Sequence, residues 1–237
     1  MDKEFSRSEM LIGSDAMQKL RESHIAVVGI GGVGSFAAEA LARSGVGSLT
    51  LVDSDTVSDT NINRQLTALH STLGKNKAEV MGNRILDINP DISLYIVQDR
   101  YCAATREKFF SMRYSYVIDA IDIVTDKLDL ISSAKNLEIP IVSALGTGNK
   151  FNASQLTVAD ISKTYGCSFA KIIRKELRAR GIFHHTVVYS PELPRKSISE
   201  EAPPPGRRSV PGSLIWVPAS AGLMLAGHVI MSLTNIG

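Results

Sequence analysis

A glycine-rich turn between two apolar runs is the feature that most constrains the fold of this chain. Residues 24–53 read HIAVVGIGGVGSFAAEALARSGVGSLTLVD. An apolar strand leads into the turn GIGGVG at 29–34, an amphipathic helix follows, and a second strand ends at Asp53. This order and length are those of a βαβ unit, in which the turn and the start of the helix bind a phosphate group.

The individual residues of the turn fit nucleotide binding. Gly29 permits the tight turn, Gly31 lets the backbone approach a phosphate, and Gly34 allows close packing of the helix. The helix N-terminus adds unpaired N–H groups and a partial positive charge. Asp53 lies about 20 residues on, where an acidic residue can bind ribose hydroxyls. The alternative is an aspartate that only caps a turn at the end of its strand.

Helices and strands continue to alternate over the first 150 residues. This alternation predicts an α/β fold with a Rossmann-like, mostly parallel sheet that carries helices on both faces. A helix is expected over 75–89, and strands are expected over 92–98, 114–122 and 140–148.

The pattern changes after Gly148. One more strand-like run, SQLTVADIS, precedes a basic helix at 169–181 and a short strand at 185–190. The loop at 191–212 is rich in proline, serine and charge, which is typical of a mobile segment.

Length and composition agree with one soluble domain. The chain has 237 residues, of which 44% are hydrophobic and 21% are charged. Residues 1–237 are therefore expected to form a single domain, with a nucleotide-binding core at 8–150. Residues 151–237 are expected to be a C-terminal elaboration for substrate binding and dimer formation.

The two cysteines, Cys102 and Cys167, lie far apart in the sequence. They argue against a disulfide framework and against a four-cysteine zinc site. The N-terminus lacks the apolar stretch of a signal peptide. A cytoplasmic protein without structural zinc is expected.

The apolar C-terminal segment reads SLIWVPASAGLMLAGHVIMSLTNIG. A membrane span needs about 20 continuous apolar residues. Here Pro218 interrupts the run and His228 lies inside it. A buried core helix or a dimer helix is therefore favoured over a membrane anchor, and membrane association is not expected.

Residues 54–80 carry polar side chains that dinucleotide binding alone does not require. Asn61, Arg64 and Gln65 lie in DTNINRQ, and Lys75 and Lys77 lie in GKNKA one short loop later. Cations beside a polyphosphate suit a reaction that builds up charge on phosphorus. Asp122, at the end of the DAID strand, is expected at the same crevice, where it could hold a magnesium ion that bridges phosphates.

These segments resemble the adenylation core of the ubiquitin-activating superfamily, whose bacterial members include the adenylyltransferases of sulfur-carrier proteins. The likeness covers roughly residues 8–150 and rests on GIGGVGS, LVDSDTVSDTNINRQ, GKNKAEV and DAIDIVTDK. It implies that ATP is bound by Gly29, Gly31, Gly34, Asp53, Asn61, Arg64, Gln65 and Lys77.

The resemblance also implies roles for three catalytic residues. Arg64 is implied to be an arginine finger that can reach into the site of a partner subunit, which would make a homodimer part of the mechanism. Lys77 is implied to polarise the α- and β-phosphates, and Asp122 is implied to support Mg²⁺.

The second half resembles one branch of that superfamily, the tRNA threonylcarbamoyladenosine dehydratases. The likeness rests on GTGNKFNASQLTVADISKT, FAKIIRKELRARGI, VVYSPELP and VPGSLIWVPASAGLMLAG. It implies that ATP activates the carboxylate of N6-threonylcarbamoyladenosine in tRNA as an acyl-adenylate, and that a ring then closes with net loss of water. The attacking group is already on the substrate, so proximity can lower the barrier by up to roughly 7–11 kcal/mol.

Basic residues outnumber acidic ones between Lys163 and Arg208, which favours a polyanionic partner. The expected contacts to tRNA phosphates are Lys150, Arg174, Lys175 and Arg178. The alternative is an ordinary solvated helix face. His184 and His185 are expected to face RNA or to form a turn.

Cys167 could be a nucleophile or a persulfide carrier, in which case a sulfur-transfer protein would be a partner. A small buried thiol is the favoured interpretation, and Cys102 is interpreted as structural.

Two other functions remain open at this point. The first is an adenylyltransferase that activates the C-terminus of a ubiquitin-like sulfur carrier; the absence of paired Cys-x-x-Cys motifs and the basic helix count against it. The second is a nucleotide-dependent oxidoreductase on the same fold. Arg64 and the loop with Lys75 and Lys77 count against this second alternative.

Overall fold

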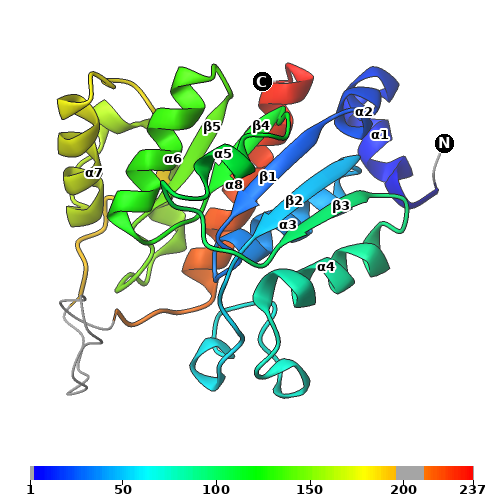
Figure 1. The fold of residues 1–237 in the computed structure, drawn as a ribbon, viewed down its shortest axis with the longest axis horizontal. Helices are drawn as coiled ribbons and strands as arrows, with labels where there is room; N and C mark the ends of the chain where they lie inside the picture. The colour runs from blue at the N-terminus through cyan, green and yellow to red at the C-terminus, as the bar shows by residue number, and fades with distance from the viewer. Residues whose placement is uncertain (1–2, 196–210, 237) are drawn as a thin grey trace.

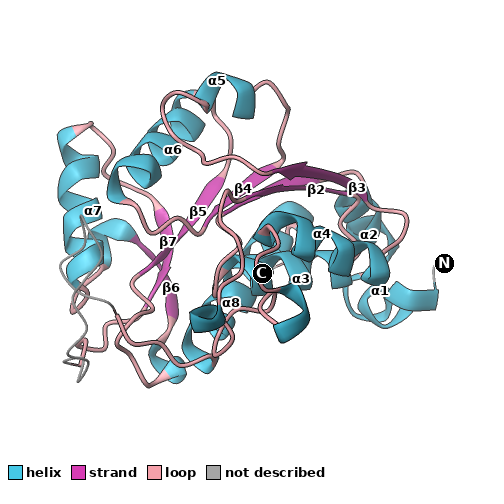
Figure 2. Ribbon diagram, turned by 60° about the horizontal axis from the view of Figure 1, so that its bottom comes forward, coloured by secondary structure: helices cyan, strands magenta, loops and turns pink. Residues whose placement is uncertain are grey.

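The computed structural model describes residues 3–195 and 211–236, which form a central sheet between two layers of helices (Figures 1 and 2). The seven strands have the order β3-β2-β1-β4-β5-β7-β6. All neighbouring strands pair in parallel except β6, which runs antiparallel to β7. The strands are β1 (His24–Val28), β2 (Ser48–Val52), β3 (Ser93–Val97), β4 (Tyr116–Asp119), β5 (Ile141–Leu145), β6 (Thr157–Asp160) and β7 (Thr186–Tyr189).

The helices cover both faces of the sheet, as Figure 2 shows. One layer contains α1 to α4 and α8, and the other contains α5 to α7. This arrangement confirms the predicted Rossmann-like fold. The helices are α1 (Ser6–Ile12), α2 (Ser14–Arg21), α3 (Gly34–Arg43), α4 (Lys77–Ile88), α5 (Arg106–Phe109), α6 (Val124–Asn136), α7 (Ser168–Ala179) and α8 (Trp216–Thr234).

Strand β1 shows why the sheet is apolar throughout its centre. Ile25 and Val27 belong to the core beneath α3 and α8, whereas Ala26 and Val28 belong to the core beneath α6. Successive side chains of a strand point to opposite faces, so a strand covered on both faces needs a continuous apolar run.

Helix α8 corrects the expectation that Pro218 interrupts the C-terminal helix. The helix begins at Trp216, and Pro218 lies in its first turn, where a missing N–H removes no intrahelical bond. The helix packs mainly on α3 and buries Val217, Ala221 and Leu225. In the described part of the chain α8 is also the one helix long and apolar enough to cross a membrane, and 44% of its apolar window is buried.

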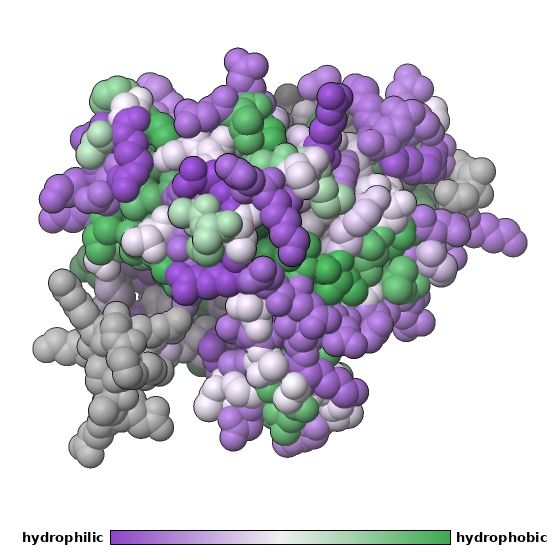
Figure 3. Space-filling model, viewed as in Figure 1, coloured by the Kyte–Doolittle hydropathy of each residue, from purple (hydrophilic) through white to green (hydrophobic). Residues whose placement is uncertain are grey.

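The carboxyl ends of the parallel strands meet at the lower edge of Figure 1, and the connecting loops gather there. The segment between β2 and α4 projects furthest from this edge. It carries a hydrophobic patch among polar groups (Figure 3); Ile62, Leu69 and Leu73 are its exposed large apolar residues. Of the loop expected over 191–212, residues 196–210 lie outside the described residues.

Candidate functional site: a nucleotide crevice at the strand ends

The glycine turn follows β1 and opens α3. Gly29 has a φ of +92°, and a Cβ there would lie 2.9 Å from the carbonyl oxygen of Ala120. A Cβ on Gly34 would lie 1.8 Å from the carbonyl oxygen of Gly29. Both positions therefore require glycine because of backbone contacts within the protein.

Gly31 differs from these two glycines because its surroundings are open. In the described part of the chain, a Cβ at Gly31 would meet only Nε2 of Gln65, at 3.8 Å. Val33 precedes α3 and has no polar side chain with which to cap the helix. The Ser35 N–H of the first turn donates to the Gly31 carbonyl at 3.1 Å, and the partial positive charge of the α3 N-terminus favours an anion that approaches across Gly31.

Asp53, which directly follows β2, accepts a hydrogen bond from this turn. Its Oδ2 accepts a hydrogen bond from the Ile30 N–H at 2.6 Å, and its Oδ1 accepts one from the Asp55 N–H at 2.8 Å. Burial raises the pKa of Asp53, while these two hydrogen bonds and the positive charge of Lys77 act in the opposite direction. The carboxylate therefore lies next to the glycine turn, and its role as a ribose ligand stays a prediction.

The start of α4 is bound to the loop that follows β2 by hydrogen bonds and an ion pair. Asn76 caps the helix by accepting from the Glu79 N–H, and its Nδ2 donates to the carbonyl oxygens of Asp53 and Asp55. Lys77, the first residue of α4, is buried and forms an ion pair of 2.8 Å with Asp55. The ammonium group therefore reaches the crevice from a fixed helix end.

Arg64 and Gln65 approach the glycine turn from the projecting segment. The Arg64 guanidinium donates to the Thr60 carbonyl at 2.8 Å and to Asn63 Oδ1 at 2.9 Å. A Cβ on Gly32 would lie 3.5 Å from both Cγ and the carbonyl oxygen of Arg64. Burial lowers the pKa of Arg64. The Arg64 side chain thus lies at the glycine turn of its own chain.

The side chain of Gln65 shows whether a polar ligand would find an unused hydrogen-bonding group beside the glycine turn. Its side chain is buried, yet its Oε1 has no hydrogen-bond partner among the described residues. A buried amide oxygen without a partner is unfavourable by about 1–3 kcal/mol. Because Nε2 of the same amide faces Gly31, a polar ligand above the turn would lie within reach of this group.

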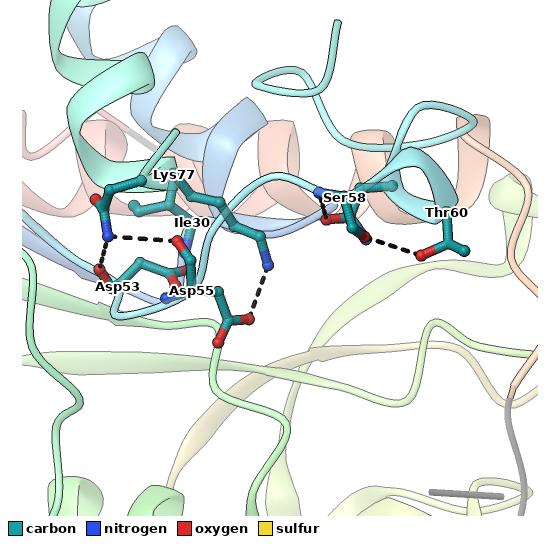
Figure 4. A network of polar contacts seen from close by, with 8 residues as sticks. Ile30, Asp53, Asp55, Ser58, Thr60 and Lys77 are labelled. Atoms are coloured by element: carbon teal, nitrogen blue, oxygen red, sulfur yellow. Dashed lines mark hydrogen bonds and ion pairs between the residues drawn. The ribbon is translucent and has the colours of Figure 1, made fainter. Parts of the chain in front are cut away.

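Asn61 is buried and has a partner within its own loop. Its Oδ1 accepts from the Ser58 N–H at 3.2 Å, in a short helical turn at 59–61 that also positions Thr60. The amide of Asn61 therefore holds the segment that presents Arg64. Figure 4 shows Ser58 and Thr60 in this turn, beside the Asp53–Lys77 group.

The acids that follow β4 differ in their environments. Asp122 is exposed, whereas Asp119 is fully buried. Asp119 forms an ion pair of 2.6 Å with Lys127, and its Oδ1 accepts from the Ile121 N–H at 3.0 Å. Asp119 therefore holds the turn that carries Asp122, and of these two acids it is Asp122 that a ligand in the crevice can reach.

Sequence reasoning missed the buried network around Asp119. Ser143 Oγ donates to Asp119 Oδ2 at 2.6 Å and lies 2.7 Å from Nε2 of His185. Since a hydroxyl has one proton, His185 must donate from Nε2, and its Nδ1 is then a bare acceptor. Nδ1 is buried without a partner among the described residues. Burial, followed by the charges of Lys135 and Lys127, lowers the pKa of His185 to about 3.

The expected tRNA contacts do not share one environment. Lys150 is 3% exposed and donates to the Ser190 carbonyl, so burial removes it from the surface. Arg174 is half-buried and donates to the carbonyl and hydroxyl of Thr164. Lys175 and Arg178 are exposed on α7.

The two histidines before β7 also differ from each other. His185 is buried, so the expectation that it faces RNA is wrong. His184 is exposed and lies 3.3 Å from Asp160.

The described residues offer few possible ligands for a metal ion. They contain no group of three or more His, Cys, Asp or Glu side chains that could hold a metal ion. Mg²⁺ in nucleotide sites takes one or two carboxylates and completes its shell with phosphates and water. A single exposed carboxylate such as Asp122 is compatible with that mode.

The fold and the crevice together define a class: a Rossmann-like α/β protein whose glycine turn is flanked by an acidic strand end and by an arginine and a lysine. Comparison with known families places the chain within this class. The chain belongs to the ThiF family, whose profile matches residues 5–237.

Among curated proteins, the chain is 44% identical to the tRNA threonylcarbamoyladenosine dehydratase of Bacillus subtilis, over 97% of this chain and 94% of that protein. It is 32% identical to the sulfur carrier protein ThiS adenylyltransferase of Escherichia coli, over 61% of this chain and 58% of that protein. Among solved structures, the E. coli tRNA N6-threonylcarbamoyladenosine dehydratase TcdA in complex with AMP superposes with a TM-score of 0.90. That match has 36% identity and covers 98% of this chain and 94% of TcdA; TcdA in complex with ATP gives 0.89.

Proposed function

We propose that this protein is an ATP-dependent tRNA threonylcarbamoyladenosine dehydratase. It activates the carboxylate of N6-threonylcarbamoyladenosine in tRNA as an acyl-adenylate, and ring closure then proceeds with net loss of water. The observation that carries this proposal is the extent of the likeness. The dehydratase of B. subtilis matches almost the whole chain, including the C-terminal third, whereas the ThiS adenylyltransferase matches 61% of it.

The crevice supports an assignment of roles for ATP. The phosphates lie across Gly31 at the N-terminus of α3, and Asp53 accepts hydrogen bonds from the ribose hydroxyls. Arg64 and Lys77 neutralise the charge that develops on the α-phosphate when the carboxylate attacks it and pyrophosphate leaves. Gln65 Oε1 supplies an acceptor beside the turn. Because Arg64 lies at its own glycine turn, the proposal has it act within its own chain.

Magnesium would be held by Asp122 together with the phosphates. When bound, the ion would neutralise phosphate charge, and the exposed position of Asp122 at the end of β4 suits this role. Asp119 keeps the Asp122 turn in place through the Ile121 N–H. This assignment predicts that Asp122→Asn shifts the magnesium titration of activity to higher concentrations.

The proposal includes a homodimer and a tRNA surface. Helix α1 supports the dimer, since Met10 and Leu11 are 79% and 87% exposed on it. Lys175 and Arg178 of α7 support the tRNA surface. A cytoplasmic location follows from a tRNA substrate.

Cys167 is interpreted as structural within this proposal. Its thiol is 6% exposed and accepts from the Ala170 N–H at 3.5 Å as the N-cap of α7. In the alternative in which Cys167 carries a persulfide, a sulfur-transfer protein would act on this thiol, and its burial favours the capping role instead.

The test is incubation of the protein with ATP, Mg²⁺ and tRNA that carries N6-threonylcarbamoyladenosine, followed by mass analysis of the nucleosides. The expected result is ATP-dependent loss of one water from that nucleoside. The alternative function, adenylation of a ubiquitin-like sulfur carrier, is tested in parallel by mass analysis of the carrier. An unchanged nucleoside together with an adenylated carrier would replace the first proposal by the second.

A further inference from the structure

Two half-exposed aromatic side chains border the crevice on the β5 side of the sheet. Phe151, in the segment after β5, is 50% exposed, and Trp216, the first residue of α8, is 49% exposed. The indole Nε1 of Trp216 donates to the Phe151 carbonyl at 2.7 Å. The two residues therefore hold each other although they are 65 positions apart in the chain.

Their position relative to the glycine turn is fixed by two contacts. A Cβ on Gly32 would lie 3.4 Å from Cβ of Pro218, which belongs with Trp216 to the first turn of α8. Asn63, next to Arg64, donates through Nδ2 to the Ser213 carbonyl at 3.0 Å. The start of α8 and the segment before it therefore contact the glycine turn and the loop that carries Arg64.

Hydrogen bonds of Asn149 and Glu192 hold the segment that carries Phe151. Asn149 donates its N–H to the Gly212 carbonyl at 2.8 Å, and the Gly212 N–H donates to Asn149 Oδ1 at 2.7 Å. Both carboxylate oxygens of Glu192 accept from the Phe151 N–H, and Glu192 Oε2 also accepts from the Asn152 N–H at 2.9 Å. A preordered frame of this kind reduces the entropy lost when a ligand binds.

The side chain of Arg195 lies beside these two aromatic residues. The Arg195 guanidinium lies over the Phe151 ring, with Cζ 4.8 Å from the ring centroid, which is within the range of cation–π attraction. The Arg195 N–H donates to the Asn149 carbonyl at 2.9 Å, so the same frame positions this residue.

Rings and guanidinium planes at the surface are the groups on which RNA-binding proteins stack unpaired bases. We infer that Phe151, Trp216 and Arg195 form a stacking platform for an unpaired nucleotide of the RNA substrate, next to the nucleotide whose carboxylate is activated. This inference rests on the proposed function. ATP itself is not the occupant, because Asp53, the expected ribose partner, ends β2 on the opposite side of β1 from β5.

The platform contains its own spectroscopic probe, since Trp216 is the only tryptophan of the chain. We expect a short single-stranded RNA with the anticodon-loop sequence to quench its fluorescence, because a stacked base contacts the indole directly. A duplex RNA of equal length, and ATP alone, should leave the fluorescence unchanged. Equal quenching by the duplex, quenching by ATP alone or no quenching by the single strand would overturn the inference.

Substitutions test the same point through turnover. Phe151→Leu and Trp216→Leu should each raise KM for tRNA by roughly fivefold to a hundredfold, as expected for one lost stacked base, and should leave ATP affinity unchanged. Trp216→Phe should recover most of the loss because it keeps an aromatic face. Tyr95→Leu, at a 44% exposed ring on edge strand β3, is the matched control and should change neither quantity.

The outcomes separate the platform from the proposed function. If wild-type protein does not dehydrate the modified nucleoside, the proposed function fails, while fluorescence still reports whether RNA stacks on Trp216. If wild-type protein is active but KM for tRNA is unchanged in both leucine variants, the platform is wrong. Should Trp216→Leu unfold, Phe151→Leu decides, because half of its ring lies outside the core.

Discussion

The glycine-turn region at 29–77 and the C-terminal region at 149–185 place their charged residues in different ways. In the first, Asp53, Arg64 and Lys77 all lie at one crevice, held there by short loops and a helix end. In the second, the basic residues are dispersed: Lys150 is buried and donates to the Ser190 carbonyl, Arg174 donates to Thr164, and Lys175 and Arg178 are exposed on α7. A motif specifies where the backbone turns, and so places its side chains. A surplus of positive charge specifies no position, so a basic residue can equally well be part of the structure.

The largest expected effect concerns the buried ion pair on β4, a strand that lies between the two regions in the sheet. Lys127→Met leaves the Asp119 carboxylate buried without its cation, which should lower the free energy of unfolding by about 3–5 kcal/mol. Chemical denaturation with circular dichroism measures this loss.

A second variant shows whether the loss comes from the uncompensated charge. In Asp119→Asn/Lys127→Met, both charges are removed and the amide oxygen introduced at position 119 can still accept from the Ile121 N–H, so much of the stability should return. If the double variant is no more stable than Lys127→Met, the loss comes from packing at Lys127 rather than from the stranded carboxylate.

The next effect tests whether the crevice acts on ATP. Arg64→Ala should lower turnover by about 10²–10³-fold, because it removes a donor that stabilises charge on the transferring phosphoryl group, and by more if Arg64 acts as an arginine finger. Single-turnover dehydration of modified tRNA measures the rate. Arg113→Ala, at an exposed arginine away from the crevice, is the matched control. A variant at position 64 with near wild-type turnover would disprove the arginine-finger assignment.

The sequence predicted the parallel sheet and the helices on both faces, because turns and alternating patterns are local properties. The roles given to Asp53, Arg64, Lys77 and Asp122 stay predictions. The sequence did not predict that Asp119 and His185 share a hydrogen-bond network through Ser143, because that contact joins three segments that are far apart in the chain. Nor did it predict the burial of Lys150, since nothing near that residue in the sequence indicates that the Ser190 carbonyl will accept a hydrogen bond from its ammonium group. Pro218 was misjudged because a proline in the first turn of a helix and one that breaks a helix look the same in an apolar run.

His185 makes the stability of the C-terminal region depend on pH. Its pKa is about 3 in the folded protein and about 6.5 when unfolded, so between these values the unfolded state binds more protons. Stability should therefore rise with pH across this window, and should fall by about 2 kcal/mol between pH 7 and pH 5. Denaturation at both pH values, with wild-type protein and His185→Gln, measures this contribution. An equal loss in both proteins would assign the pH dependence to other groups.

The smallest expected effect separates surface charges from structural charges on α7. Lys175→Gln and Arg178→Gln each remove one exposed cation, and each should lower the slope of log affinity for tRNA against log salt concentration by about one unit, because one fewer counterion is released. Arg174→Gln should leave the slope unchanged and should instead lower the free energy of unfolding by about 1 kcal/mol, because its hydrogen bonds to Thr164 are lost. Binding titrations across a salt series, with a parallel ATP titration as a control for folding, measure all three variants. A reduced slope in Arg174→Gln would mean that the guanidinium leaves Thr164 to bind RNA, whereas unchanged slopes in the other two variants would move the tRNA surface away from α7.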